Sequence, residues 1–526
     1  MKKIATGIAA AFLVSAGTAA LAETPQKGGE LIYGISAEAP TFDCGGSDTF
    51  AVLHTVAPFY SLLLKVDLAN YPNIVGDLAK SWEISPDGLT YTFQIHEGVT
   101  FHDGSPLTSE DIKATYDRYR APPEGVPSFR KAQLADIASV EAPTPTTVVF
   151  KLKAPNPAML LTLASPNGCI YSAKKLAEDP RFPIQNIMGS GPFKFVENVK
   201  GSHTSGVRFE NYFRKDRPYL DGFRAVQFSQ SAAMVNAIQG AQIMGEFRTV
   251  SPADRDRLSA AMGDNVKFYE SDWSTSLVLV FNGSKAPFND VRVRQALSMA
   301  IDRPAAGAGL RKTAVLRNVG GIMRPGAPFA TPPAELAKFP GFGGDGKAAK
   351  EQAKKLLKEA GVENLKFTLI NRTTNQPYTP SGVFLVDQWR QIGVEVEHKQ
   401  LETASYRQAV RDKNFDVVLD FINAVPEDPS INLTRYVSGS PDNPATGVDK
   451  EYDALFEQQK REQDPAKRAE IVAKMNARVI EQAHQVPFLW WYRTVALNSR
   501  VKGWVMSPSH LFGQDLGDVW LAPEKK

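Results

Sequence analysis

The sequence has few of the features that mark a redox, metal-dependent or catalytic protein. It holds two cysteines among 526 residues, and its seven histidines are dispersed along the chain. It contains neither the paired histidines of a metalloprotease helix nor the Gly-x-Ser-x-Gly turn that exposes a nucleophilic serine. These absences argue against an enzyme, and we predict no bound metal and no cofactor.

An excess of charge of one sign is missing as well. Two of the 60 basic residues lie in the first 22 positions, which leaves 58 against 57 acidic residues and a net charge of +1. A net charge this close to zero gives no electrostatic reason for binding nucleic acid or an anionic membrane. Long apolar runs are also missing beyond the N-terminus, so no later segment is predicted to span a bilayer.

The first 22 residues have the layout of a secretory signal peptide. Lys2 and Lys3 precede an uncharged, Ala-rich run from Ile4 to Gly17, and Ala20 and Ala22 supply the small residues of a cleavage site. The apolar run is shorter than the roughly 20 residues that a membrane span needs. We therefore expect export to the periplasm and a mature chain that starts at Glu23.

An exported chain is permitted a disulfide bond, and Cys44 and Cys169 are the two cysteines available. A bond between them would close a loop of about 125 residues, for which loop entropy gives roughly 4–5 kcal/mol of stabilisation. Two free buried thiols are the alternative, because sequence alone does not show that the two Cβ atoms meet.

The length predicts more than one lobe, since single cores stop growing near 250–300 residues. The part from 347 to 421 is the clearest, because helix and strand patterns alternate there and predict a parallel α/β unit. Ligands of such sheets bind beyond the carboxyl ends of the strands, which places 420–429 at a cleft wall. The expected order is helix 347–360, strand 365–369, helix 384–392, strand 394–396, helix 404–411 and strand 415–421.

A glycine-rich segment from Gly341 to Lys347 has most of the spacing of a phosphate-binding loop. The residue after the lysine should be Ser or Thr to hold magnesium, but it is Ala348. The segment before it ends in Pro340 and is not an apolar strand. We interpret it as a loop that precedes a helix.

Several segments in the same order resemble one known family. They are 75–82 (VGDLAKSW), 87–93 (DGLTYTF), 98–104 (GVTFHDG), 189–193 (GSGPF) and 288–297 (FNDVRVRQAL). With these segments, the chain resembles the extracellular solute-binding protein family 5 of ABC importers, which has dipeptide-, oligopeptide- and nickel-binding members. The resemblance extends over essentially the whole mature chain.

The resemblance implies an α/β fold with the two lobes of a type II periplasmic binding protein and an extra domain inserted in the first lobe. It places the first lobe at 23–275, with the insertion at about 60–180, the second lobe at 276–489, and a C-terminal return to the first lobe at 490–526. The chain would cross between lobes near 273–279 and 487–492, and these crossings would form the hinge.

The function implied is capture of a peptide-like or other small organic solute and its delivery to an ABC permease in the inner membrane, by a monomer. A periplasmic hydrolase, or a receptor or chaperone using the same cleft, is the alternative.

Peptide-binding members hold the ligand's α-amino group with an Asp shortly before an Asp-Pro-like step. Aligning Asp428 with that step puts the expected Asp near Ala424 or Val425, which are apolar, so ordinary dipeptide binding is in doubt. Asp420, Glu427 and Asp428 remain as substitutes.

A pocket for a small solute should be mostly apolar and aromatic with a few converging polar groups. We hypothesise that Arg248 pairs with an anionic group of the ligand. Each site residue also has a plain structural alternative, namely core packing, a surface salt bridge, or a helix cap in the case of Asp428. The predicted ligand-binding residues are Arg248, Trp273, Phe421, Asn423, Asp428 and Tyr436.

Overall fold

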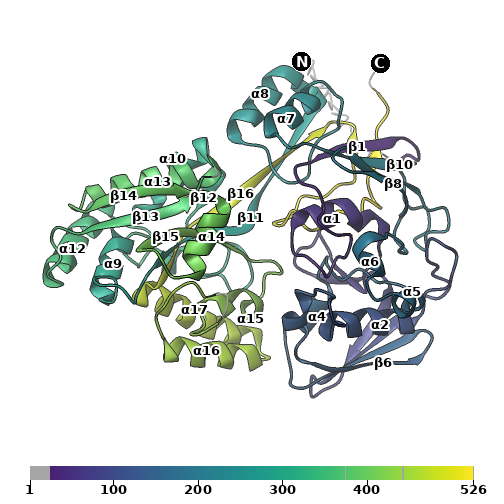
Figure 1. Ribbon diagram of the computed structural model, residues 1–526, viewed down its shortest axis with the longest axis horizontal. Helices are drawn as coiled ribbons and strands as arrows, with labels where there is room; N and C mark the ends of the chain where they lie inside the picture. Colours follow the sequence, from purple (N-terminus) through teal and green to yellow (C-terminus); the bar gives the residue numbers. More distant parts are fainter. Residues whose placement is uncertain (1–23, 374, 441–442, 525–526) are drawn as a thin grey trace, which may run out of the picture.

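The computed structural model describes residues 24–373, 375–440 and 443–524, so the predicted signal peptide at 1–22 lies outside the described residues. The chain forms two lobes side by side (Figure 1). Two long antiparallel strands, β11 (Val266–Phe281) and β16 (Gln485–Asn498), run from one lobe into the other. The two-lobe α/β fold expected from the sequence is confirmed.

The first lobe is built on a sheet in the order β1-β10-β9-β8, in which β1 runs parallel to β10. Leu31, Tyr33 and Ile35 alternate along β1 and are buried in one apolar core. That core also takes in α1 (Phe50–Val56). The strands are β1 (Glu30–Ile35), β8 (Phe193–Val199), β9 (His203–Arg208) and β10 (Gly222–Gln227), and helices α7 (Ser231–Gln239) and α8 (Pro252–Met262) follow them.

A second, antiparallel sheet of the first lobe has the order β4-β5-β7-β6 and lies within the range predicted for the insertion. Tyr91, Phe93 and Ile95 alternate along β5, and all three side chains are buried. Thr108 and Asp111 form a capping box at the start of α2 (Ser109–Arg120). The other elements of this region are β2 (Leu64–Val66), β3 (Ile74–Gly76), β4 (Ala79–Ile84), β5 (Thr90–Ile95), α3 (Arg130–Gln133), β6 (Ile137–Thr144), β7 (Thr147–Leu152), α4 (Met159–Leu163), α5 (Ala173–Glu178) and α6 (Phe182–Gln185).

The second lobe contains a six-stranded sheet in the order β12-β16-β11-β15-β13-β14, with helices on both faces (Figure 1). The predicted parallel unit is present, because β13 pairs in parallel with both β14 and β15. Its elements are α9 (Val291–Met299), α10 (Arg303–Thr313), β12 (Leu316–Asn318), α11 (Pro333–Leu336), α12 (Gly346–Glu359), β13 (Lys366–Arg372), α13 (Asn375–Arg390), β14 (Glu395–Leu401), α14 (Thr403–Arg411), β15 (Val417–Asn423), α15 (Pro429–Asn432), α16 (Lys450–Arg461) and α17 (Pro465–Gln482).

The central strands of this sheet are apolar on both sides. Leu277 and Leu279 of β11 belong to one buried cluster, and Val278 and Val280 belong to another on the opposite face. Side chains of a strand alternate between faces, so a strand covered by helices on both sides needs a continuous apolar run. The glycine-rich segment before α12 is a loop as interpreted, and the Asp345 side chain caps the helix.

Helix α13 starts earlier than the pattern predicted, at Asn375 rather than near 384, and has a non-helical residue at Gln376. The added part of the helix contains Pro377 and Pro380. Both prolines, however, lie in the first turn after Gln376, where backbone N–H groups have no intrahelical acceptor. Proline is therefore tolerated there, and its fixed φ suits the first helical position.

The C-terminal segment returns to the first lobe after β16. Val495, Leu497 and Trp504 are buried in the same core as the N-terminal strand β1.

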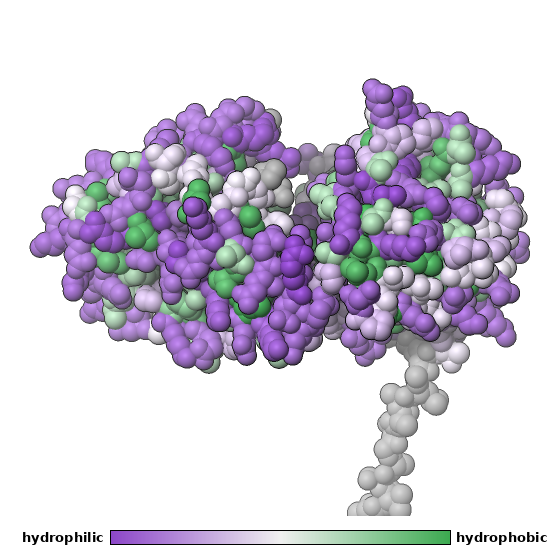
Figure 2. Space-filling model, turned by 90° about the horizontal axis from the view of Figure 1, so that it is seen from below, coloured by the Kyte–Doolittle hydropathy of each residue, from purple (hydrophilic) through white to green (hydrophobic). Residues whose placement is uncertain are grey.

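None of the helices in the described ranges has the length and apolar character that a membrane crossing requires. The lower face carries scattered apolar patches within a largely hydrophilic surface (Figure 2).

Cys44 and Cys169 form a disulfide bond within the first lobe, with their Cα atoms 6.0 Å apart. Both residues are buried, and Tyr171 accepts a hydrogen bond at its hydroxyl from the Cys44 backbone N–H (2.9 Å). The bond closes a loop with a sequence separation of 125 residues. It therefore ties the N-terminal part of the lobe to the end of the antiparallel region.

Replacing both cysteines tests this contribution. The double variant Cys44→Ala/Cys169→Ala should lose about 4–5 kcal/mol of unfolding free energy, because its unfolded chain is no longer constrained by the loop. Urea denaturation followed by circular dichroism measures the loss. An unchanged midpoint and slope would show that the bond contributes nothing to stability.

Candidate functional site

The carboxyl ends of β13 and β15 point toward the first lobe, and a cavity of about 620 Å³ lies between them and that lobe. Arg372, Phe421 and Asn423 line it from the strand ends. Asn167 and Leu511 line it from the first lobe. A ligand in this space would touch both lobes at once, at the edge where open α/β sheets bind ligands.

The crossing strands border this region. Pairing of β11 with β16 is interrupted between Asp272 and Ser276, where the register shifts. Trp273 lies inside this interruption, is buried, and packs edge-on against Trp491 and His510 at centroid distances of 5.4 and 5.2 Å. Trp273 is thus a packing residue of the crossing, and it is not among the residues that line the cavity.

Arg248 lies next to the crossing on the first-lobe side. Its guanidinium lies over the rings of Phe50 (4.8 Å) and Trp273 (5.6 Å). Its Nε is buried and has no hydrogen-bond partner among the described residues. Burial lowers the pKa of Arg248, the nearby Glu246 and Tyr378 counteract this, and the positive charge of Arg372 lowers it further.

Arg372, at the end of β13, was missed by the sequence analysis. Its guanidinium lies over the rings of Tyr378 (4.6 Å) and Phe421 (4.9 Å) and donates to the Tyr378 hydroxyl. Its buried Nε has no partner within the described part of the chain. The rule that ligands bind beyond the carboxyl ends of parallel strands could have found it, because Arg372 ends β13 as Asn423 ends β15.

Three acidic side chains near the strand ends, the suggested substitutes for the missing aspartate, are each bound by an arginine. Asp420 accepts from Arg435 (2.6 Å) and from the Tyr406 hydroxyl (2.8 Å). Glu427 accepts from Arg324 at 2.5 and 2.8 Å, and Asp428 accepts from Arg468 at 2.7 and 2.8 Å. These pairings neutralise the carboxylates, so they are poor anchors for a ligand ammonium group.

The six predicted site residues therefore fall into two groups. Trp273 and Arg248 lie at the crossing, and Phe421 and Asn423 line the cavity, where Asn423 accepts a hydrogen bond from the Thr275 hydroxyl (3.3 Å). Asp428 instead caps α15 and is buried with Arg468, away from the lining. Tyr436 is buried in a core cluster of the second lobe, so we leave both residues out of the site.

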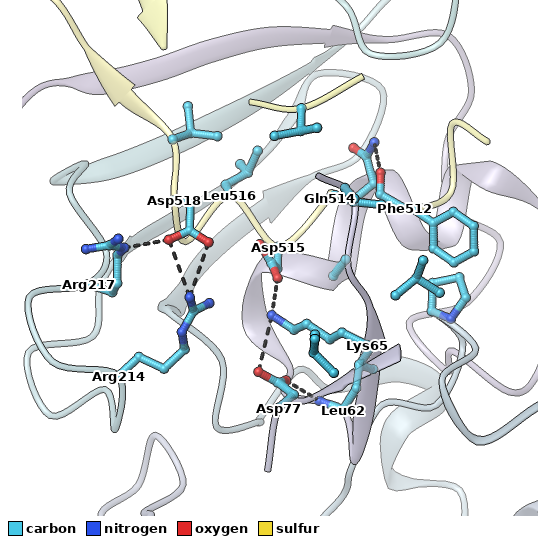
Figure 3. A pocket seen from close by; sticks show the side chains of 18 of the residues that line it. Leu62, Lys65, Asp77, Arg214, Arg217, Phe512, Gln514, Asp515, Leu516 and Asp518 are labelled. Atoms are coloured by element: carbon cyan, nitrogen blue, oxygen red, sulfur yellow. Dashed lines mark hydrogen bonds and ion pairs between the residues drawn. The ribbon is translucent and has the colours of Figure 1, made fainter. Parts of the chain in front are cut away.

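A separate cavity of about 730 Å³ lies within the first lobe (Figure 3). Most of its charged side chains are mutually paired, because Lys65 bridges Asp77 and Asp515 while Arg214 and Arg217 share Asp518. Every segment that lines it belongs to the first lobe or the C-terminal return. A ligand there would not join the lobes, so the smaller cavity between the lobes is the better candidate site.

Two histidines lie beneath Arg248 and are held neutral. His54 donates from Nε2 to the backbone carbonyl of His510 (2.8 Å), since a carbonyl can only accept. Burial lowers the pKa of His54 to about 3 and lowers the pKa of His510 well below its usual range, and the nearby cation Arg248 contributes in the same direction. Within the described residues, no group of acidic, histidine or cysteine side chains is arranged to hold a metal ion.

The family described as bacterial extracellular solute-binding proteins, family 5 Middle, matches residues 73–444. The chain belongs to this family. A putative ABC transporter peptide-binding protein of Brucella ovis is 32% identical over 377 residues, 69% of this chain and 68% of that protein. This solute-binding protein is accordingly the binding component of an ABC importer.

Solved structures show the same fold. The substrate-binding protein CtaP of Listeria monocytogenes has a TM-score of 0.83 at 24% identity and covers 94% of this chain and 100% of its own. The binding protein AgaA of A. tumefaciens R10, in complex with agropinic acid, has a TM-score of 0.77 at 24% identity, with 94% and 99% covered. Likeness at this identity establishes the two-lobe fold of the solute-binding protein.

Breaking the Asp428–Arg468 pair separates the structural role of Asp428 from a ligand role. Asp428→Asn should cost about 3–5 kcal/mol of unfolding free energy, because it leaves Arg468 as a buried charge without its counter-ion. Ligand affinity should stay unchanged once the folded fraction is corrected for. Chemical denaturation and calorimetric titration give the two values, and a loss of affinity at unchanged stability would return Asp428 to the site.

The buried histidines predict a loss of stability in mild acid. In the unfolded chain each histidine binds a proton near pH 6.5, whereas folded His54 stays neutral down to about pH 3. The unfolded state therefore binds more protons between these values, and stability should fall by about 1.4 kcal/mol per pH unit for each such histidine. His54→Gln should reduce the slope of unfolding free energy against pH by about one proton between pH 6.5 and 4. An unchanged slope would contradict the buried neutral histidine.

Proposed function

We propose that this protein captures a small organic or peptide-like solute in the periplasm by closing its lobes on it, and then delivers it to the permease of its ABC importer. The observation that carries the proposal is the cavity of about 620 Å³ lined by both lobes beside the crossing strands. Its size suits a small molecule, since ligand pockets span about 300–1,000 Å³.

The lobe bounds of this proposal are 23–275 for the first lobe, with the inserted subdomain at about 60–180, 276–489 for the second, and 490–526 for the return. The hinge lies where β11 and β16 lose register, between Asp272 and Ser276. At that point the backbone N–H of Ser274 donates a hydrogen bond to the carbonyl of Pro508 in the return segment (2.8 Å). The carbonyl of Ser274 accepts one from the backbone N–H of Ala424 in the second lobe (2.7 Å). A few residues at such an interruption can absorb the rotation of one lobe against the other.

A cross-lobe contact would favour the closed form. The Tyr71 hydroxyl, on the turn between β2 and β3, donates to Glu427 of the second lobe (2.6 Å). Glu427 is already held by Arg324, and the Tyr71 ring lies 6.3 Å from Phe512. A ligand that touches both lobes would shift the population toward this closed arrangement, which the permease then recognises.

The signal-like residues 1–22 and the disulfide bond support a periplasmic location. Relatives named as ABC transporter peptide-binding proteins support a peptide-like ligand and a permease partner in the inner membrane. The protein would act as a monomer, without nucleic acid and without catalysis of its own.

Native mass spectrometry of the protein purified from periplasm tests this function. We expect a retained small compound that is released unchanged on denaturation. Its addition to the emptied protein should reduce the radius of gyration measured by small-angle X-ray scattering, because the lobes close. As a matched variant, Tyr71→Phe should weaken affinity about 2- to 10-fold, the effect of one hydrogen bond. Chemical turnover of the compound, or binding without closure, would contradict the proposal.

A further inference from the structure

Two arginines that form no salt bridge with a described residue approach each other from opposite lobes, although the carboxylate of Glu246 lies near Arg248. Arg248 belongs to the first-lobe side of the crossing and Arg372 to the end of β13 in the second lobe. Arg248 lies over the ring of Trp273 and Arg372 over the ring of Tyr378, and both rings pack edge-on against Trp491, at centroid distances of 5.4 and 6.4 Å. The positive charge of Arg372 also lowers the pKa of Arg248. The Nε–H of each arginine is buried, and no described residue accepts a hydrogen bond from it.

Aromatic rings determine how these guanidinium groups can be used. Phe50 and Trp273 lie against Arg248, and Tyr378 and Phe421 lie against Arg372. Ring contacts occupy the faces of a guanidinium and favour its cationic form, while its N–H groups donate from the edges in a fixed fork. Such a fork matches the two oxygens of a carboxylate or a similar planar anion.

The cavity as a whole is electropositive. The charged side chains in its lining give a net charge of +2, and Asp420 is already neutralised by Arg435. A cleft lined by an excess of positive charge attracts anions. Arg372 belongs to this lining, whereas Arg248 lies beside it at the crossing. The charged lining residues of the cavity are Asp48, Arg372, Arg407, Arg411, Asp420 and Arg435.

We propose that Arg248 and Arg372 form a cross-lobe clamp for the carboxylate of an anionic solute, an organic acid or a peptide-like compound with a free carboxyl group. The inference rests on the proposed capture function and names its substrate class. It reverses the usual polarity of a peptide site, in which a protein carboxylate anchors a ligand ammonium group.

The clamp also links binding to closure. Without an anion, bringing Arg248 and Arg372 together costs electrostatic energy in a poorly solvated region, which favours the open form. A carboxylate between them replaces repulsion by two charge-assisted contacts. The anion therefore has a larger affinity for the closed form, which is the condition for a ligand to drive the change.

The test uses the full mature chain and a pool of small molecules from yeast extract, divided by anion-exchange resin into an anionic and a non-anionic fraction. The anionic fraction should raise the melting temperature of the wild type but not of Arg248→Gln or Arg372→Gln. The control is Arg390→Gln, whose side chain is 77% exposed at the end of α13, and it should respond like the wild type.

The stabilising anion is then purified, and its dissociation constant is measured by calorimetry. Each of the two glutamine variants should bind it about 10- to 100-fold more weakly, the loss of one charge-assisted contact. Arg372→Lys, which keeps the charge but loses the fork, should lie between. Scattering should show the ligand-free Arg372→Gln protein shifted toward the closed form, a result that a merely destabilising change would not produce.

The outcomes separate the two proposals. Stabilisation by the non-anionic fraction, or equal stabilisation of the wild type and both glutamine variants by the anionic one, would overturn the clamp and leave solute capture standing. If neither fraction stabilises or closes the wild type, the capture function itself fails. Circular dichroism of each variant confirms that it is folded before these comparisons are made.

Discussion

The pairing of β11 with β16 is the constraint on which the rest of the structure depends. These strands take part in both lobes, so their antiparallel ladder fixes the position of one lobe relative to the other. The ladder is broken between Asp272 and Ser276, and there the side chain of Trp273 and the backbone of Ser274 contact segments from elsewhere in the chain. The proposed hinge therefore lies next to the candidate site, since Ala424, directly after the cavity-lining Asn423, bonds to Ser274.

Charge pairing decides which groups remain for a ligand. Asp420, Glu427 and Asp428 would look like cation anchors if they were judged by residue type alone. Each is already satisfied by an arginine of its own lobe, and an ion pair of good geometry has little left to offer a ligand. Arg248 and Arg372 are instead surrounded by aromatic rings, and the Nε–H of each has no acceptor among the described residues. The asymmetry makes the space between the lobes selective for anions.

Much of the second lobe could be predicted from the sequence, because local signals and tertiary structure agree there. The alternation of apolar strands and amphipathic helices from 347 to 421 depends on periodicities of two and 3.6 residues, and the observed β13, β14 and β15 follow it. The start of α13 was missed because Pro377 and Pro380 are breakers in most contexts and tolerated only in a first turn. The rest of the site combines Phe50 of the first lobe with Arg372 and Tyr378 of the second, which are far from Phe50 in the chain, and no local pattern predicts that they meet.

The sequence by itself determined the export signal expected at 1–22, the family, the two-lobe α/β class and the absence of an aspartate at Ala424 or Val425. These follow from residue order and from local periodicity, which a linear chain displays directly. Only the tertiary structure decided that Asp428 forms a salt bridge with Arg468 and that Tyr436 is buried in a core cluster. It also decided that Arg372 of the second lobe lies close enough to Arg248 to lower the pKa of Arg248. Partnerships of this kind depend on which side chains are close in space, and that is decided by packing between segments distant in the sequence.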